Sequence, residues 1–195
     1  MEGNIRMAKI LRASVMRRSE WYNERDQDEW KRIRSQVFKR DNFTCVYCGW
    51  KARRFQQVNH IGAEDDHSID NLETVCAACH AVLHIGIKSM EGLISTFDCK
   101  PELTNMAKIV HATRVLVSQH TPWSEIERQV LEHYALPDGH VYTCDETTGL
   151  ANQMLKTIPL GEYRGYLPEG KAILFHASPP WKGFPERVHL WQLPD

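Results

Sequence analysis

The sequence predicts an α+β protein with a small zinc-stabilised ββα core, flanked by N-terminal helices and by a C-terminal region of helices and short strands. Three observations predict this class. Two CxxC pairs stand 27 residues apart, two short extended runs lie between them, and a helical run with a pair of histidines follows the second pair. The 195 residues are 42% hydrophobic and 25% charged, which is ordinary for a globular protein.

The two CxxC pairs are Cys45/Cys48 and Cys76/Cys79. Each pair can direct two thiolates at one point about 2.3 Å from a zinc ion, and two pairs complete a closed tetrahedral site. Gly49 suits the tight turn of such a knuckle because glycine tolerates positive φ. Four core cysteines or two disulfides are the alternatives, but this spacing favours structural zinc.

The segment between the two pairs predicts a hairpin. Residues 56–61 (QQVNHI) read as a short strand, and the acidic residues 64–66 end it in a loop. Asp70 and Asn71 then form a turn, and residues 72–75 return as a second strand toward Cys76. A helix beginning at the second knuckle completes the ββα unit.

That helix carries His80 and His84. At about 100° per residue the two lie within about 40° of each other, and His84 lies about 140° round the helix from Cys79. One helix can therefore serve a zinc site and, with its two imidazoles opposite His60, a second metal centre. The alternative makes His84 a half-buried core residue and His80 a neighbour of the zinc site.

This pattern, with the lead-in RSQVFKRDNFTCVYCG, resembles the HNH endonuclease motif of the ββα-metal nucleases, over residues 30–85. The resemblance implies a treble-clef-like core and hydrolysis of DNA phosphodiester bonds. It implies His60 as general base, His80 and His84 as ligands of a catalytic divalent metal, and Asn71 as a residue that either helps to hold this metal or fixes the loop orienting the base. Many family members have Asp or His where this chain has Asn59, whose oxygen can bind a cation but adds no charge.

The chemistry follows from these residue types. An imidazole with a pKa near its ordinary value of about 6.5 can take a proton from water at neutral pH. A divalent ion (Mg²⁺ or Mn²⁺, with Ni²⁺ or Zn²⁺ also suitable) held by His80 and His84, with Asn59 or Asn71 as a third ligand, would stabilise the charge on the phosphate and the leaving 3′ oxygen. The alternative is a catalytically silent zinc-stabilised module that binds nucleic acid or acts as an adaptor.

The charge is distributed unevenly. Residues 1–54 hold 14 Lys and Arg against 7 Asp and Glu, whereas the rest of the chain holds 10 against 18. Helices rich in Lys and Arg are also common for solubility alone, but the basic residues around the first knuckle lie close to the proposed chemistry, so we expect them to contact DNA phosphates. These residues are Arg34, Lys39, Arg40, Lys51, Arg53 and Arg54.

We expect the chain to divide into three segments: an N-terminal basic helix and connection (1–27), the nuclease domain (28–90) and a C-terminal region (91–195). Apolar spacing predicts helices and strands there, and Gly86 is expected to stop the helix after the second knuckle. We expect helices at 5–18, 28–39, 103–119 and 121–134, a connection at 19–28, and short strands at 172–176 and 188–193. Trp30 and Phe38 are expected in the core.

Compartment and partners are predicted from composition. No hydrophobic run approaches 18 residues and no apolar signal core begins the chain, so we expect a cytoplasmic protein without a membrane partner. Six cysteines, four of them in zinc spacing, suit a reducing compartment. DNA is the expected partner, and the acidic C-terminal region is expected to pack on the nuclease module, restrict access or dock a protein.

Overall fold

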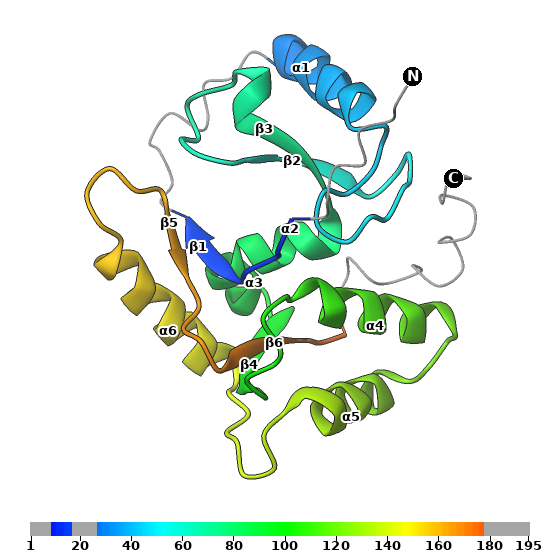
Figure 1. Cartoon of the computed structure of the whole chain (residues 1–195), viewed down its shortest axis with the longest axis vertical. Helices are drawn as coiled ribbons and strands as arrows, with labels where there is room; N and C mark the ends of the chain where they lie inside the picture. Colours follow the sequence, from blue (N-terminus) through cyan, green and yellow to red (C-terminus); the bar gives the residue numbers. More distant parts are fainter. Residues whose placement is uncertain (1–8, 17–26, 178–195) are drawn as a thin grey trace.

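The computed structural model describes residues 9–16 and 27–177. Its strands form three two-stranded antiparallel sheets, with helices packed around them (Figure 1). The strand pairs are β1 (Ser14–Met16) with β5 (Arg164–Tyr166), β2 (Gln56–His60) with β3 (Leu72–Cys76), and β4 (Ile94–Asp98) with β6 (Lys171–Phe175). The helices are α1 (Gln27–Arg40), α2 (Ala77–Leu83), α3 (Ile85–Met90), α4 (Ala107–Ser118), α5 (Trp123–Tyr134) and α6 (Cys144–Thr157).

The cysteine-rich module, residues 45–84, has the predicted order of knuckle, strand, loop, strand, knuckle and helix. β2 pairs with β3 from Gln56 opposite Cys76 to His60 opposite Leu72. A 3₁₀ turn, η2 (Ile69–Asn71), precedes β3, and α2 follows it directly. The predicted mixed fold with a ββα core is therefore confirmed.

Asp41, directly after α1, fastens this helix to β3. Its carboxylate accepts hydrogen bonds from Arg40 Nε and Nη2 at 2.8 Å each and from the backbone N of Thr74 at 2.9 Å. Burial raises the pKa of Asp41, but the bonds from Arg40 and Thr74 outweigh it, so the pKa lies below 3.8. α1 is thereby held over the β2–β3 hairpin (Figure 1).

We expect Asp41→Asn to lower the free energy of unfolding by about 1–3 kcal/mol, because it removes the charge from a buried carboxylate that accepts these bonds. The folded-state pKa is below the unfolded value, so the carboxylate's contribution is complete above about pH 4 and is lost only as pH falls through the folded pKa. Urea unfolding at pH 5, 7 and 8 should give one constant difference. Asp28→Asn, in the exposed pair with Lys31, should change little; a difference that varies over this pH range would contradict the assignment.

The prediction of a helix at residues 5–18 is wrong for residues 9–16, which are the part of this range that the structure describes. Leu11, Ala13 and Val15 are all buried, with a spacing of two that also suits an extended chain. Met106 N donates to Leu11 O, and Val15 pairs with Gly165 in β1–β5. Ile10, which fits the helical spacing, is exposed. Contacts with distant partners, and not the local apolar spacing, therefore decide the conformation of this segment.

Gly86 does not stop a helix. α2 ends at Leu83, because the next residue, His84, has a φ of −133° and a ψ of 46° that break the helical geometry, and Gly86 lies within α3. A Cβ at Gly86 would stand 3.2 Å from the Cβ of Ala151 in α6. The glycine therefore permits close packing of α3 on α6, which is a tertiary requirement.

The expected helices at 28–39, 103–119 and 121–134 and the strand at 172–176 are confirmed as α1, α4, α5 and β6, with small shifts of their ends. Four further elements, α3, β4, α6 and β5, were not predicted from the sequence. α6 did carry a signal, because Thr143 and Glu146 form a reciprocal capping box at its start. Of the connection expected at 19–28, residues 27 and 28 lie in α1, and residues 19–26 lie outside the described residues, as does the strand expected at 188–193.

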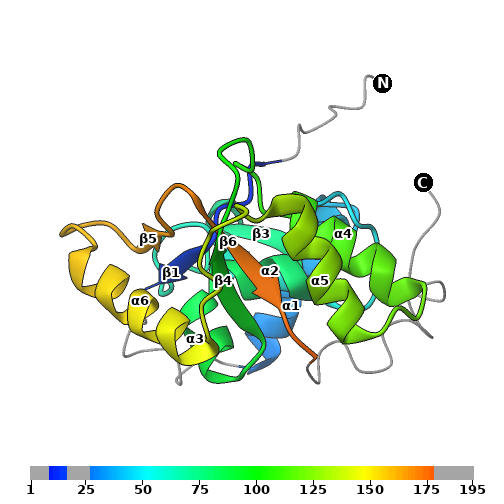
Figure 2. The same cartoon turned by 90° about the horizontal axis from the view of Figure 1, so that it is seen from below.

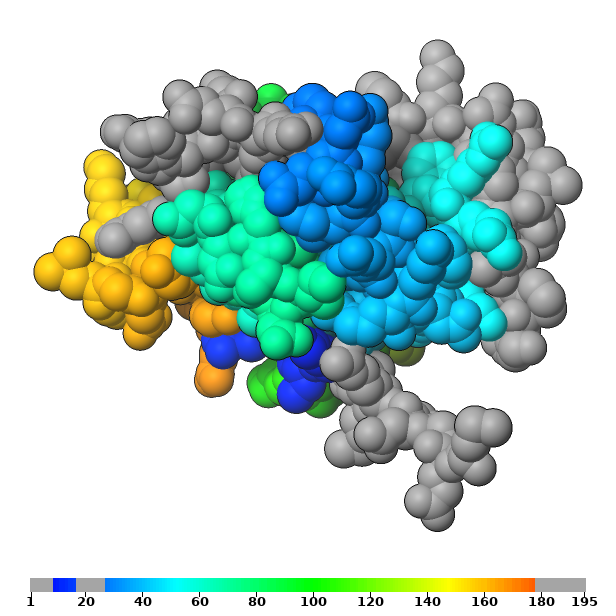
Figure 3. Space-filling model, turned by 90° about the horizontal axis from the view of Figure 1, so that it is seen from above, coloured from blue at the N-terminus to red at the C-terminus, as the bar shows by residue number. Residues whose placement is uncertain are grey.

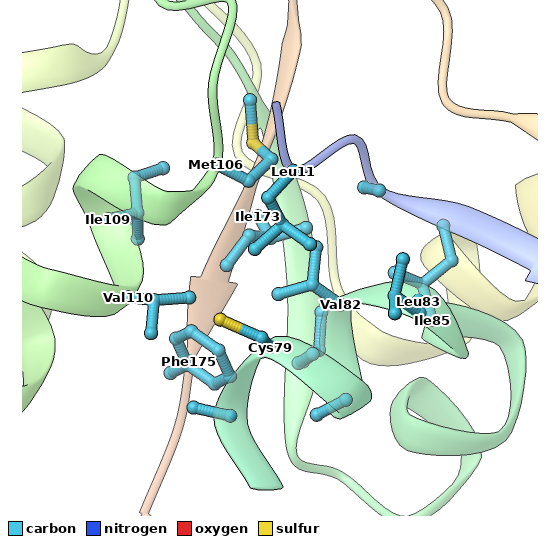
Figure 4. Packing of buried hydrophobic residues seen from close by; sticks show 14 of the residues in the cluster. Leu11, Cys79, Val82, Leu83, Ile85, Met106, Ile109, Val110, Ile173 and Phe175 are labelled. Carbon is cyan, nitrogen blue, oxygen red and sulfur yellow. The ribbon is translucent and has the colours of Figure 1, made fainter. Parts of the chain in front are cut away.

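One hydrophobic cluster joins the cysteine-rich module to the C-terminal elements. Cys79 and Val82 of α2 face Phe175 and Ile173 of β6, with Val110 of α4 beside them (Figure 4). Burial of each large apolar side chain contributes about 1.5–3 kcal/mol. Seen from below, β4 and β6 cross the middle of the molecule, with α6 on one side and α4 and α5 on the other (Figure 2).

His176, directly after β6, links two further elements. Its Nε2 lies 2.8 Å from Ser95 Oγ in β4, and its Nδ1 lies 2.9 Å from Glu127 Oε1 in α5. A serine, imidazole and carboxylate in this order resemble a hydrolytic triad. Ser95 is only 1% exposed, so we interpret the chain of bonds as a tie between α5 and the β4–β6 sheet.

Candidate active site

The four cysteines of the two knuckles converge. Their sulfur atoms all lie within 4.8 Å of one another, and none forms a disulfide. Cys48 Sγ and Cys76 Sγ are 3.7 Å apart, close to the edge of about 3.8 Å of a tetrahedron with metal–sulfur bonds of about 2.3 Å. The expected cluster is confirmed, and it could hold a structural metal ion.

Arg114 of α4 supports this cluster from outside the module. Its Nη1 donates to Cys48 Sγ at 3.4 Å, and its guanidinium lies over the ring of Trp50, 5.4 Å from the ring centroid. The pKa of Cys48 is lowered, first by hydrogen bonds from Cys45 and the other thiols and also by the charge of Arg114. A thiolate at this position suits a metal ligand.

His60, His80 and His84 all line one cavity of about 440 Å³. It lies between the end of β2, α2 and α3, and α1 contributes Trp30 and Arg34 to its wall. The three imidazoles thus share one environment. Among the described residues, however, the cysteines are the only group of three or more potential ligands within 4.8 Å of one another, so the imidazoles are not closed around a single point.

His60 is the last residue of β2 and is 7% exposed. The ring of Trp30 stacks parallel to its imidazole, with centroids 5.8 Å apart and an interplanar angle of 3°. His67, from the loop after β2, meets the same imidazole edge-on at 5.3 Å. Trp30 is thus half-buried beside the site rather than within the main core.

His80 and His84 are paired across the end of α2, with ring centroids 4.5 Å apart. Burial, together with the charges of Lys88 and Arg164, lowers the pKa of His80 to about 4. His80 is therefore a neutral imidazole at neutral pH, which is the form that binds metals. The rings of His80 and His84, on one wall of the cavity, provide a donor set suited to a divalent ion with other positions left open.

The carboxamide of Asn71 makes hydrogen bonds to the backbone of the loop that follows His60. Its Oδ1 accepts from Gly62 N at 2.7 Å, and its Nδ2 donates to the carbonyls of Ala63 and Asp66 at 2.8 and 2.7 Å. A Cβ at Gly62 would lie only 3.0 Å from this oxygen, so glycine is needed for the approach. Of the two expected roles of Asn71, these contacts favour fixing the loop.

Asn59 is enclosed in a buried polar network. Its Nδ2 donates to Glu73 Oε1 at 2.8 Å, and its Oδ1 accepts from Arg164 Nη2 at 2.9 Å. Glu73 also accepts from Tyr47 and Lys9, at 2.7 Å each. The oxygen expected to bind the catalytic metal is thus directed at a guanidinium.

Sequence reasoning did not identify Glu73 or Arg164. Glu73 had one signal in the sequence, because it is a charged residue within an expected strand, and the structure buries it. Arg164 had none, since it lies 105 positions from Asn59 in the chain. Burial lowers the pKa of Arg164 from its ordinary 12.5, and the network supplies acceptors for its N–H groups.

The six basic residues expected at DNA differ in their surroundings. Arg40 donates to Asp41 and to the carbonyls of Ile69 and Leu72, at 2.6–2.8 Å, so its guanidinium holds the fold. Arg34 lines the cavity. α1, the loop of residues 61–70 and the segment around residues 50–55 share one face of the molecule (Figure 3).

Residues 45–84 match the family model described as HNH endonuclease. The chain is 38% identical over 75 residues to a protein named "Probable HNH endonuclease" of Lactococcus phage SK1, covering 34% of this chain and 77% of that protein. It is 36% identical over 88 residues to "Type 4 apparatus protein DotN" of Legionella pneumophila, covering 43% of this chain and only 40% of that protein. The convergent cysteines, the shared cavity and these matches together show that this protein belongs to the HNH endonuclease family.

Proposed function

We propose that this protein is a metal-dependent DNA endonuclease, with zinc in the four-cysteine site. The observation that carries the proposal is the shared cavity, which brings His60 on the hairpin and His80 and His84 on the helix to one place. Membership of the HNH endonuclease family supports a nucleic-acid substrate. The paired thiolates favour zinc, since Cys₄ clusters with this spacing bind it in preference to harder ions.

His60 acts as the general base in this proposal. Its place at the end of β2, held by Trp30 on one face, fixes the imidazole at the wall of the cavity. From there it accepts a proton from water, and the resulting hydroxide attacks the phosphorus. Cleavage of the bond to the 3′ oxygen then leaves a 5′ phosphate and a 3′ hydroxyl.

His80 and His84 would hold the catalytic divalent ion. The ion supplies Lewis acidity toward the phosphate and the leaving oxygen when it is bound. The donor set fits Mn²⁺, Ni²⁺ or Zn²⁺ through its imidazoles and Mg²⁺ through the phosphate oxygens of the substrate. Asn59 is the weaker candidate ligand because its oxygen already accepts from Arg164.

The face that carries α1 and the first knuckle would bind the DNA backbone, through Arg34, Lys39, Lys51, Arg53 and Arg54. Such contacts position the duplex without reading its sequence. We propose the cytoplasm as the compartment, because a four-thiolate site requires reduced cysteines. Among the described residues, the structure contains no helix long and apolar enough to span a membrane.

Arg53→Ala with Arg54→Ala is expected to weaken DNA binding and to reduce the slope of log K against log salt by about one to two, since each phosphate contact contributes about 0.9. Both side chains are exposed. Fluorescence anisotropy with a labelled duplex at several salt concentrations measures this slope. Lys156→Ala, on the exposed side of α6, is the matched control and should leave it unchanged; an unchanged slope in the double variant would remove this face from the interface.

Cleavage of supercoiled plasmid tests the proposed function. We expect nicked and linear DNA in Mg²⁺ or Mn²⁺ and none after the exchangeable metal is removed with a mild chelator that leaves the zinc in place. Elemental analysis of the same sample should give one tightly held zinc per chain, plus a second metal that exchanges. No cleavage in any of the four metals would contradict the proposal.

The second candidate function is a silent binding or adaptor module. Two observations favour it: the engagement of Asn59 by Arg164, and the absence of a three-imidazole cluster among the described residues. A protein of this kind would bind DNA through the same basic face, or a protein partner through its acidic C-terminal region, and would contain only the first metal. The elemental analysis therefore separates the two candidates.

A further inference from the structure

We infer that Arg164, far outside the matched segment, is a positioning residue that holds His60 and His84 in register across the cavity; this inference rests on the proposed function. Arg164 is the first residue of β5 and is 9% exposed. It does not line the cavity, so its role is exerted through the groups that it contacts.

Its guanidinium fixes the end of β2. Nη2 donates to the carbonyl of His60 at 2.5 Å and to Asn59 Oδ1 at 2.9 Å. These are the backbone of the proposed base and the side chain just before it. A rotation of the strand that moved the His60 imidazole away from the cavity would therefore break both bonds.

The other arm of the same guanidinium reaches α2. Nη1 donates to Leu83 O and to Ser14 Oγ, at 3.3 Å each, and Ser14 Oγ itself donates to Leu83 O at 3.0 Å. Leu83 directly precedes His84, where the helix breaks. A rigid, planar fork with its donors in fixed directions thus connects the strand of one imidazole to the helix end of the other.

The network around Glu73 keeps this cation in place. Glu73 is buried and lies on the far side of the Asn59 carboxamide, which bridges it to Arg164. A buried guanidinium is tolerated only when its donors and charge are matched. Asn59 therefore serves to bind Arg164. The segment after residue 160 thus contributes to the geometry of the site and does not only cover it.

Arg164→Lys tests this role, because lysine keeps the charge but loses the fork. We expect zinc content to stay at one per chain and kcat for plasmid cleavage to fall by about 10²-fold, with KM changed less than about threefold, as for a base displaced by about 1 Å. In NMR spectra of histidine-labelled protein, the imidazole signals of His60 and His84 should shift, while those of His133, exposed on α5, should not.

Arg12→Ala is the matched control. Arg12 adjoins the same β1–β5 sheet and lies over the ring of Tyr166, 4.4 Å from its centroid, but it is exposed and makes none of the contacts above. It should leave the His60 and His84 signals and kcat unchanged. Unmoved signals in Arg164→Lys, or equal shifts in Arg12→Ala, would overturn the inference.

The NMR signals also separate this inference from the proposed function. If wild-type protein cuts no DNA, the shift of His60 and His84 in Arg164→Lys still supports the positioning role, and its absence still refutes it. If Arg164→Lys loses zinc and structure, Ser14→Ala replaces it. This change removes the β1 hydroxyl that accepts from Arg164 Nη1 and donates to Leu83 O at the end of α2, and it leaves the arginine in place. A smaller shift of the His84 signal is then expected, and none would overturn the inference.

Discussion

Replacing His60 with alanine is expected to reduce the rate of plasmid cleavage by about 10²–10⁴-fold, because it removes the proposed proton acceptor. The imidazole is 7% exposed and ends β2 at the cavity wall, where Trp30 stacks against it. Zinc content and the unfolding temperature should stay close to those of the wild type, since the hairpin bonds and the cysteine cluster do not involve the imidazole. Plasmid cleavage in Mg²⁺ and Mn²⁺, elemental analysis and thermal denaturation measure these three outcomes.

His133→Ala is the matched control for this variant. His133 is exposed on α5 and touches Tyr134, outside the cavity, so the same chemical change there should leave cleavage at the wild-type rate. Wild-type cleavage by His60→Ala would remove His60 from the mechanism. An equal loss in both variants would point to a change in the preparation instead of the chemistry.

Cys79→Ser is expected to have the largest effect on stability. Cys79 is fully buried and serves both the cysteine cluster and the hydrophobic core around Phe175. Structural zinc contributes about 10–16 kcal/mol in small zinc peptides, which is comparable to the whole stability of about 5–15 kcal/mol of a typical domain. We therefore expect loss of zinc and loss of cooperative unfolding, including that of α4 and β6, because one core connects them to α2.

Circular dichroism during heating and the zinc-to-protein ratio measure this loss. A strong chelator should bring the wild type to the same state. Cys144→Ser is the control, since Cys144 begins α6, is half-buried and stands outside the cluster. A folded, zinc-free Cys79→Ser protein would show that the apolar core suffices without the metal.

The module between residues 45 and 84 was predictable because its constraints are local. The ligand spacing within a CxxC pair and the short extended runs of β2 and β3 depend on backbone geometry over a few residues. The same holds for α1, α4 and α5, whose apolar periods run for three turns or more. The capping box of α6 was equally local and was available in the sequence.

The sequence by itself thus determined the metal knuckles, the hairpin, the helix with its two imidazoles and the family to which they belong. Only the tertiary structure decided that residues 14–16 form a strand, that Gly86 packs between helices and that Asn59 is bonded to Arg164. The physical reason is separation along the chain. Arg164 lies 105 positions from Asn59 in the chain, so the local spacing of residues gives no sign of their contact. In the folded protein both are buried, and the hydrogen bond from the guanidinium then decides the role of the Asn59 side chain.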